Sequence, residues 1–373
     1  MRVPFSAWLR SAMQLRRFAA VAAAAAVWSA CGGGIPASLV PIVAPAQRAA
    51  SVPCAKQTCI YVTDNAGQSP HPRDDKVLVF SRDATGNAAP VAHIAGSKTH
   101  LVYPRAVALD TARHLYVSNY TPLEKESNVA VFAPGASGDA PPLRTISGPA
   151  TELQAPSALS LDRAGNLYVV DSYGVSSGCS SPTQGCWTVN VYAPGASGNA
   201  APIRSIRGPA TKLFYAYGSA VDASGNVYVA DGYHVNCCVT VYAAGASGNV
   251  KPLRTIQGSR TDLAVPVGVA LDSHGNVYVL NAEGSPTRSV TVYAAGAHGN
   301  VKPIRDIVGQ NTGLYAAPAG IAVDGSGRVY VLQSGTGNSI SVFAAGADGD
   351  VAPVRVITGN KTGMANPWAI AVH

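Results

Sequence analysis

Residues 268–307 read GVALDSHGNVYVLNAEGSPTRSVTVYAAGAHGNVKPIRDI. In this stretch, four short runs rich in valine, isoleucine and tyrosine are separated by clusters of glycine, asparagine, aspartate and proline. Such a pattern is typical of a meander of four antiparallel β-strands. A single sheet of this kind has two apolar faces and cannot bury both alone. The sequence therefore predicts that the sheet packs between neighbouring sheets.

The four runs return along the chain with a period of about fifty residues, which is typical of propellers and solenoids. The first run ends in aspartate and occupies residues 106–110, 158–162, 219–222, 268–272 and 320–324. The third run occupies residues 77–81, 129–133, 189–193, 239–243, 290–294 and 340–344. The fourth run occupies residues 91–94, 143–146, 203–206, 253–256, 304–307 and 354–357.

A sixth copy of the first run, residues 369–373, stands without its second run, and a second run at residues 60–64 stands without its first. We expect these two segments to pair. The result is an all-β, six-bladed β-propeller of four-stranded antiparallel blades, in which the C-terminal strand joins the N-terminal blade and closes the ring. An open solenoid would instead need polar capping repeats, and neither end of the repeat region shows one.

The fourth run is expected at the rim of the ring because a proline precedes every copy of it. Proline has no N–H to donate to a sheet ladder, so it belongs at a sheet edge or a strand start. The first run consists of small residues that can crowd around a central axis. The six prolines are Pro90, Pro142, Pro202, Pro252, Pro303 and Pro353.

The repeat resembles that of NHL-type six-bladed β-propellers, whose blades show a similar progression from GVAVD through a Gly-Asn turn and YVAD to V-x-VF. The resemblance extends over residues 54–373 and implies a single propeller domain there. Proteins of this type include lyases, lactone hydrolases, scaffolds and adhesive modules. The resemblance therefore implies the fold and leaves the activity open.

Residues 1–30 are expected to be a signal peptide, because arginines precede an apolar run at residues 18–28 that is too short to span a membrane. Cys31 follows a pair of small residues, as in the lipobox of bacterial lipoproteins, although Trp28 stands where that motif usually has leucine or valine. The resemblance implies that Cys31 carries a lipid. Residues 31–53 are rich in glycine, proline and alanine and are expected to form a flexible linker.

These segments predict an exported protein, held by a lipid anchor in the periplasm or outer membrane of a bacterial cell envelope, with plain secretion as the alternative. Four of the 27 basic residues and none of the 20 acidic residues lie in the signal peptide, so the net charge of the mature chain falls from +7 to +3. This excess is too small to indicate a nucleic-acid partner.

Six cysteines remain if Cys31 is lipidated, and an even number in an exported protein favours structural disulfides. They are Cys54, Cys59, Cys179, Cys186, Cys237 and Cys238. Cys54 is close enough to Cys59 to close a small loop, and so is Cys179 to Cys186. A bond between the adjacent Cys237 and Cys238 would be strained, so either of these two could pair with Cys179 or Cys186 instead.

A ring of polar side chains is expected where the second strands end, with Asp64, Asp171 and Asp231 as its carboxylates. Such a ring could bind calcium, as related lactone-hydrolysing propellers do near their axis. The alternative is that each carboxylate accepts hydrogen bonds from its own loop, in which case no cofactor is needed. A weaker possibility is a zinc site formed by His71, His100 and His234.

The loops between second and third strands differ widely among the repeats, and variable loops on a rigid ring are the usual place of function. Aromatic residues gather on this face over the blades that begin near residues 158 and 219. The candidate binding residues are Tyr173, Trp187, Phe214, Tyr215, Tyr217, Tyr233 and His234. These rings could capture a ligand or could pack together to stiffen the loops.

The sequence favours a monomeric binding propeller without catalysis, whose ligand is a protein, a small molecule or a carbohydrate. The alternative is a metal-dependent lactone hydrolase or lyase of the kind built on related propellers. The absence of clustered metal ligands in the repeat pattern favours the first interpretation, and the polar ring keeps the second open.

Overall fold

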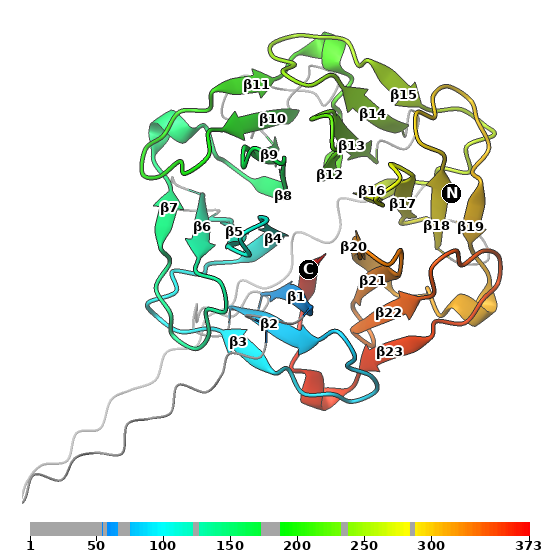
Figure 1. Cartoon of the computed structure of the whole chain (residues 1–373), viewed down its shortest axis with the longest axis horizontal. Helices are drawn as coiled ribbons and strands as arrows, with labels where there is room; N and C mark the ends of the chain where they lie inside the picture. The colour runs from blue at the N-terminus through cyan, green and yellow to red at the C-terminus, as the bar shows by residue number, and fades with distance from the viewer. Residues whose placement is uncertain are drawn as a thin grey trace, which may run out of the picture. The chain divides into compact units, whose positions relative to one another are not determined.

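Each copy of the repeat folds into a sheet of four antiparallel strands, and six such sheets form a ring around a central axis (Figure 1). The computed structural model describes Cys54 and residues 58–65, 75–121, 127–172, 187–232, 238–283 and 288–373. Its contacts divide the chain into two units, residues 1–48 and 49–373. The predicted signal peptide, Cys31 and the predicted linker lie outside the described residues. The predicted all-β six-bladed propeller is confirmed.

Each blade extends from an innermost strand at the axis to an outermost strand at the rim. In that order, blade 1 contains β24 (Pro367–Val372), β1 (Cys59–Asp64), β2 (Lys76–Ser81) and β3 (Ala92–Ile94), and blade 2 contains β4 (Pro104–Leu109), β5 (Leu115–Asn119), β6 (Asn128–Phe132) and β7 (Arg144–Ile146). Blade 3 contains β8 (Pro156–Leu161), β9 (Leu167–Ser172), β10 (Trp187–Tyr192) and β11 (Arg204–Ile206), and blade 4 contains β12 (Ala216–Val221), β13 (Val227–Asp231), β14 (Cys238–Tyr242) and β15 (Arg254–Ile256). Blade 5 contains β16 (Pro266–Leu271), β17 (Val277–Asn281), β18 (Ser289–Tyr293) and β19 (Arg305–Ile307), and blade 6 contains β20 (Ala317–Val323), β21 (Val329–Ser334), β22 (Ser339–Phe343) and β23 (Arg355–Thr358).

The hydrophobic core lies between the blades. Every residue of the middle strands β17 and β18 is buried, because both faces of a blade pack against a neighbouring blade. Strands buried on both faces read as continuous apolar runs and do not show the alternation of a half-exposed strand. This explains the Val-Tyr-Val and Val-Thr-Val runs of the repeat.

The ring closes through the pairing that the sequence predicts. Strand β24 pairs antiparallel with β1, with Ile60 opposite Val372 and Val62 opposite Ile370. At the axis, β24 also contacts β4 of blade 2 and β20 of blade 6. Blade 1 is therefore built from two segments about 300 residues apart along the chain.

A second set of contacts joins the blades at the rim. An isoleucine at or next to the end of the fourth strand, such as Ile206 in blade 3, forms a parallel bridge to a turn glycine of the next blade, in this case Gly248. The same bridge occurs between all neighbouring blades, including Ile357 of blade 6 and Gly86 of blade 1. The ring is thus hydrogen-bonded at its circumference as well as packed at its axis.

The Gly-x-x-Thr segment that follows each fourth strand locks onto the next blade. In the segment after blade 3, the Asn249 carboxamide oxygen of blade 4 accepts the Ala210 backbone N–H at 2.8 Å. A Cβ atom on Gly208 would lie 2.5 Å from that oxygen, and the φ of Gly208 is +119°, a value that favours glycine. Thr211 is buried, and its hydroxyl donates to the Gly208 carbonyl at 2.6 Å.

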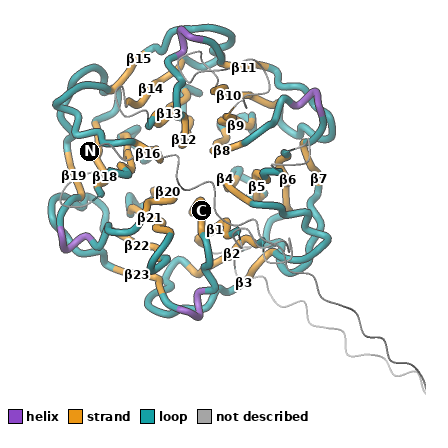
Figure 2. The backbone as a smooth tube through the Cα atoms, turned by 180° about the vertical axis from the view of Figure 1, so that it is seen from behind, coloured by secondary structure: helices purple, strands orange, loops and turns teal. Residues whose placement is uncertain are grey.

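This lock recurs at all six junctions, with asparagine or aspartate as the acceptor at 2.6–2.8 Å. The acceptors are Asn87, Asp139, Asn199, Asn249, Asn300 and Asp350. Short 3-10 turns form within four of the segments, at the outer ends of the blades (Figure 2), namely η3 (Pro149–Thr151), η6 (Pro209–Thr211), η7 (Gln310–Thr312) and η8 (Asn360–Thr362). Within the described residues, no helix has the length and apolar character needed to cross a bilayer.

One of the predicted disulfides is present. Cys54 and Cys59 are bonded, with their Cα atoms 5.8 Å apart, at the start of β1. Cys238 is buried at the start of β14. Cys179, Cys186 and Cys237 lie outside the described residues, so the pairing of the remaining cysteines stays a prediction.

Removal of residues 369–373 should prevent closure of the ring, because β24 supplies the innermost strand of blade 1 and contacts blades 2 and 6. We expect the truncated protein to lose its cooperative thermal transition, measured by circular dichroism. Deletion of five residues from the predicted linker is the control and should leave the melting temperature unchanged. Identical melting of the truncated and full-length proteins would contradict the closure.

Asn249→Ala should lower the free energy of unfolding by about 1–2 kcal/mol, because it leaves the Ala210 N–H without its acceptor. Gly208→Ala should be more destabilising, since its Cβ would collide with the Asn249 side chain. In the double variant the two effects should not add, because alanine removes the two closest atoms of the collision and leaves only the Cβ of residue 249, at 2.9 Å. Ser247→Ala, at an exposed position of the same turn, is the control. Urea unfolding measures all four, and additive effects would argue against the lock.

Candidate functional site

A β-bulge interrupts the innermost strand of every blade, at its second residue in blades 1–5 and at its third residue in blade 6. In blade 4, Ala216 pairs with Asp231 and Gly218 pairs with Ala230, so that Tyr217 has no partner in the ladder. The same shift of register occurs in the other five blades. A bulge bends the strand and re-aims the extra side chain. The six bulged residues are Arg105, Ser157, Tyr217, Val267, Ala319 and Trp368.

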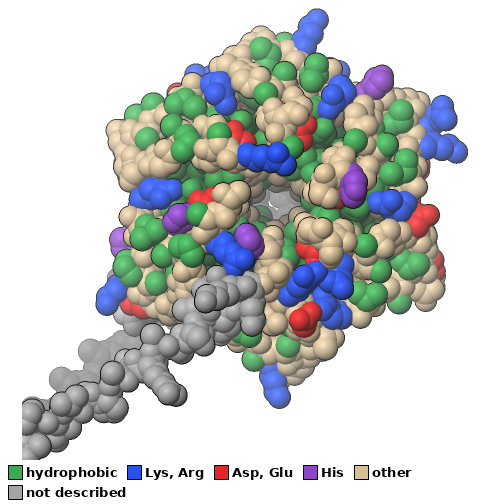
Figure 3. Space-filling view, viewed as in Figure 1, with side chains coloured by type: hydrophobic (Ala, Val, Ile, Leu, Met, Phe, Trp, Pro, Cys, Tyr) green, Lys and Arg blue, Asp and Glu red, His purple; other side chains and the backbone are tan. Residues whose placement is uncertain are grey.

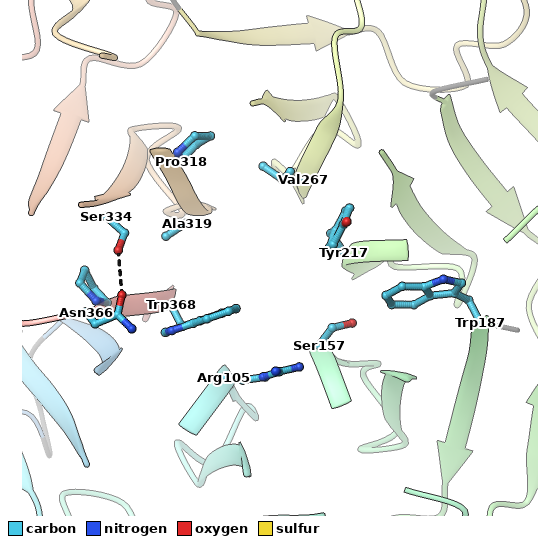
Figure 4. Close-up of a pocket in the computed structure, with 11 residues that line it drawn as sticks. Arg105, Ser157, Trp187, Tyr217, Val267, Pro318, Ala319, Ser334, Asn366 and Trp368 are labelled. Carbon is cyan, nitrogen blue, oxygen red and sulfur yellow. Dashed lines mark hydrogen bonds between the residues drawn. The ribbon is translucent and has the colours of Figure 1, made fainter. Parts of the chain in front are cut away.

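All six bulged residues line one cavity of about 400 Å³ at the mouth of the central axis. The cavity is completed by Trp187, Pro318, Ser334, Asn366 and Pro367. Arg105 and Trp368 lie on one side of it, and Tyr217 and Trp187 lie on the other (Figure 4). A narrower space of about 100 Å³ continues between the innermost strands. These strands approach closely, and a Cβ on Gly218 would lie only 2.8 Å from the Gly268 Cα atom.

Three of the predicted binding residues form one aromatic cluster. Trp187 lies edge-on to Tyr217, with ring centroids 5.8 Å apart, and its centroid is 6.1 Å from that of Tyr215. Tyr217 also packs over Gly232, where a Cβ would lie 3.0 Å from its ring. The rings thus stiffen one another, but Tyr217 remains 40% exposed and faces the cavity. Packing and ligand contact are both available to this cluster.

Arg105 is held between two aromatic rings. Its guanidinium carbon lies 3.9 Å from the centroid of the Tyr120 ring and 5.2 Å from that of the Trp368 ring. Both distances are within the range of cation–π attraction. Burial lowers the pKa of Arg105, while the nearby Tyr120 and Asp171 act in the opposite direction. A guanidinium stays charged despite such a shift, so the cavity contains a fixed positive charge.

The predicted polar ring serves the backbone. Asp171 accepts the N–H groups of Gln154 and Ala155 at 2.9 and 2.8 Å. Asp64 and Asp231 likewise accept two consecutive N–H groups each, and the corresponding side chains of the other blades accept one each. Each acceptor fixes the connection that leads into the innermost strand of its own blade. The described residues contain no group of three histidine, cysteine, aspartate or glutamate side chains arranged to hold a metal ion.

The remaining candidate residues fall into two groups. Phe214 is half-buried, and its backbone N–H donates to Asp231 at 2.6 Å. Phe214 is therefore part of the connection that Asp231 holds in place. Tyr173, Tyr233 and His234 lie outside the described residues, as does His71 of the alternative zinc site. His100 is exposed, and its backbone has a positive φ of 55°.

Nine of the eleven residues that line the cavity were not among the predicted site residues, and Arg105 and Trp368 are the largest of them. A signal for them exists in the sequence at the position that follows one residue near the start of each first strand, namely Pro104, Pro156, Ala216, Pro266, Pro318 and Pro367. There the six blades carry arginine, serine, tyrosine, valine, alanine and tryptophan, while the next positions are uniformly small or apolar. Comparison of the repeats at this position would have pointed to the whole ring of bulged residues.

The opposite face of the ring has a different character. From blade 1 to blade 6 the blades run clockwise in Figure 1 and anticlockwise in Figure 4, so these two figures view opposite faces of the ring. Figure 3 has the same view as Figure 1 and therefore shows the face away from the cavity. Charged side chains of both signs surround the central opening there. A second, polar cavity is formed by the turns between first and second strands, with Arg163, Asp222 and His274 among its lining residues. Uniform turns line this polar cavity, whereas the six bulged residues that line the cavity at the mouth of the axis all differ.

No known protein family and no curated protein matches the sequence. Solved structures are similar in fold. A protein of unknown function from Bacteroides caccae has a TM-score of 0.53 and 13% identity, over 85% of this chain and 98% of that chain. A protein from Bacteroides uniformis, provisionally described as a 6-phosphogluconolactonase, has a TM-score of 0.53 and 13% identity, over 81% and 83%. The WD40 β-propeller domain of Doa1 gives a TM-score of 0.48 at 13% identity, over 85% and 90%.

At such identities the two similarities with a TM-score of 0.53 show the fold alone. Fold and site together define the protein as a six-bladed β-propeller with a cavity at the mouth of its axis.

Asp171→Asn should change how stability depends on pH. Burial, opposed by two N–H bonds and by Arg105, raises the pKa of Asp171 from 3.8 to about 6. A carboxyl group with a raised folded pKa gives stability that is complete below the unfolded pKa and is lost as the pH rises through the folded pKa. Asparagine does not titrate, and Asn119 and Asn281 already hold this place in other blades.

The free energy of unfolding of Asp171→Asn, relative to that of the wild type, should therefore increase between pH ~4 and pH ~7. Urea unfolding at several pH values provides the measurement. Asp83→Asn, at a carboxylate that is 85% exposed, is the control and should show a smaller change. A difference between Asp171→Asn and the wild type that is equal at both ends of this range would contradict the assigned role.

Proposed function

We propose that this protein is a binding propeller whose ligand occupies the cavity at the mouth of the axis. The observation that carries the proposal is the set of six bulges, which direct six different side chains into one space. A repeat built only for stability has no need of different residues at equivalent positions. The cavity volume of about 400 Å³ is within the range of small-molecule sites.

The composition of the cavity supports binding in preference to chemistry. Its described lining residues contain no histidine, cysteine, aspartate or glutamate. The carboxylate of Asp171, which acts on Arg105 electrostatically, is occupied by two backbone N–H groups. Tyr217 and Trp368, which are 40% and 42% exposed, offer apolar surface with a polar edge, as ligand-binding sites commonly do.

We further propose that the propeller is of the NHL type and acts outside the cytoplasm, as a lipoprotein anchored through Cys31. The repeat pattern supports the first point. The arginine-rich leader and the cysteine after its small residues support the second. Residues 31–53 would then separate the ring from the membrane surface.

Replacement of Trp187 and Tyr217 by alanine tests the binding role of the cavity. We use 1-naphthaleneacetamide as a neutral aromatic probe and calorimetry as the measurement. The wild type should bind the probe saturably, and the double variant should bind it about tenfold more weakly or not at all, because the aromatic wall is gone. The melting temperature should fall only slightly, since Tyr217 is 40% exposed and Trp187 is only partly buried.

Tryptophan emission provides a second readout. Trp187 and Trp368 both line the cavity, and the other two tryptophans, Trp8 and Trp28, lie in the predicted signal peptide. His274→Ala in the polar cavity of the other face is the control and should bind like the wild type. Equal affinity of the wild type and the double variant, or a large loss of stability without loss of binding, would contradict the proposal.

A further inference from the structure

We propose that the axial cavity selects a ligand with an anionic group, such as a carboxylate, attached to an apolar ring, and that Arg105 binds the anionic group. This inference rests on the proposed binding function and gives it a chemical class. It starts from a side chain that the repeat does not require, because the other five blades have uncharged residues at the position of Arg105.

The guanidinium of Arg105 is prepared for a partner that the described chain does not supply. No carboxylate of the described residues lies within ion-pair distance of it. Among the described lining residues, no side chain is acidic. A partly buried cation without an ion pair is unfavourable, and an incoming anion removes that penalty.

The two aromatic rings fix the orientation of Arg105. Tyr120 and Trp368 contact the guanidinium at 3.9 and 5.2 Å from their centroids. An arginine stacked in this way keeps its N–H groups available at its edge, where they can donate two parallel hydrogen bonds to a carboxylate. In Figure 4 the side chain extends from β4 along one side of the cavity, toward Ser157 of the neighbouring blade.

Asp171 is the carboxylate that most affects Arg105, and its influence is limited. It is fully buried, and its two oxygens already accept the N–H groups of Gln154 and Ala155. Its pKa of about 6 reflects this burial. Asp171 thus helps to keep Arg105 charged without occupying the donors that face the cavity.

The far side of the cavity supplies the apolar half of the site. Trp187, Tyr217 and Val267 lie across the mouth from Arg105, and Pro318 and Ala319 continue this surface (Figure 4). A ligand with a charge at one end and a ring at the other satisfies both sides at once. A neutral carbohydrate would satisfy the aromatic surface and could accept hydrogen bonds, but it would leave the guanidinium without a counter-charge, so the structure favours the anion.

Three probes of similar shape and different charge test this inference. They are 1-naphthaleneacetate, 1-naphthaleneacetamide and 1-naphthylmethylamine, each titrated into the purified full-length protein by calorimetry. The acetate should bind about tenfold or more tightly than the acetamide, and the amine should bind most weakly. Added salt should reduce the preference for the acetate, since it screens the attraction.

Arg105→Gln should remove the preference for the acetate and leave the affinity for the acetamide nearly unchanged. Arg105→Lys, which keeps the charge and loses the fork of donors, should retain part of it. Arg163→Gln, on the opposite face, is the matched control and should behave like the wild type. Thermal melting of each variant shows that a change in binding is not a loss of fold.

The outcomes separate the two proposals. Equal binding of acetate and acetamide by the wild type, or a preference that survives in Arg105→Gln, would overturn the anionic class and leave the binding cavity intact. Failure of the wild type to bind any of the three probes would also overturn the anionic class. Binding that is unaffected by the alanine double variant of Trp187 and Tyr217 would instead overturn the binding role of the cavity.

Discussion

The ring depends on the lock between each fourth strand and the turn of the next blade. A single oxygen, such as Oδ1 of Asn249, fills the space that a Cβ of Gly208 would need and accepts a backbone N–H beyond it. Only glycine permits this approach, and only a short side chain with a carboxyl or amide oxygen completes it. Because the contact occurs six times, the angle between neighbouring blades is set at every junction.

The cavity follows from the same geometry. Once the rim fixes the blades, their innermost strands converge and need small residues such as Gly218 and Gly268 where they meet. The bulge at the start of each of these strands allows a larger side chain to leave the crowded ladder and turn toward the mouth of the axis. The polar ring of Asp64, Asp171 and Asp231 supports this arrangement, because it holds the connections that lead into the bulged strands.

The fold was predictable because turn chemistry and apolar runs repeat, and because the unmatched runs at residues 60–64 and 369–373 complement each other. The grouping of Trp187, Tyr215 and Tyr217 was also predictable from their concentration in two repeats. Arg105 and Trp368 were missed because each looks like an ordinary strand residue in its own blade. Their convergence depends on a bulge, which strand periodicity does not reveal, and on ring closure, which brings residues far apart in the chain to one place.

A bulged residue has no partner in the pairing register, so its side chain can be exchanged without shifting the pairs on either side of it. The six positions around the mouth therefore lie outside the strand pairing that forms the scaffold, although Ser157 also donates to the Ala216 carbonyl of the next blade. In protein engineering, this makes the ring suited to a combinatorial library in which these six residues vary together. New binding specificities could then be selected on one unchanged framework.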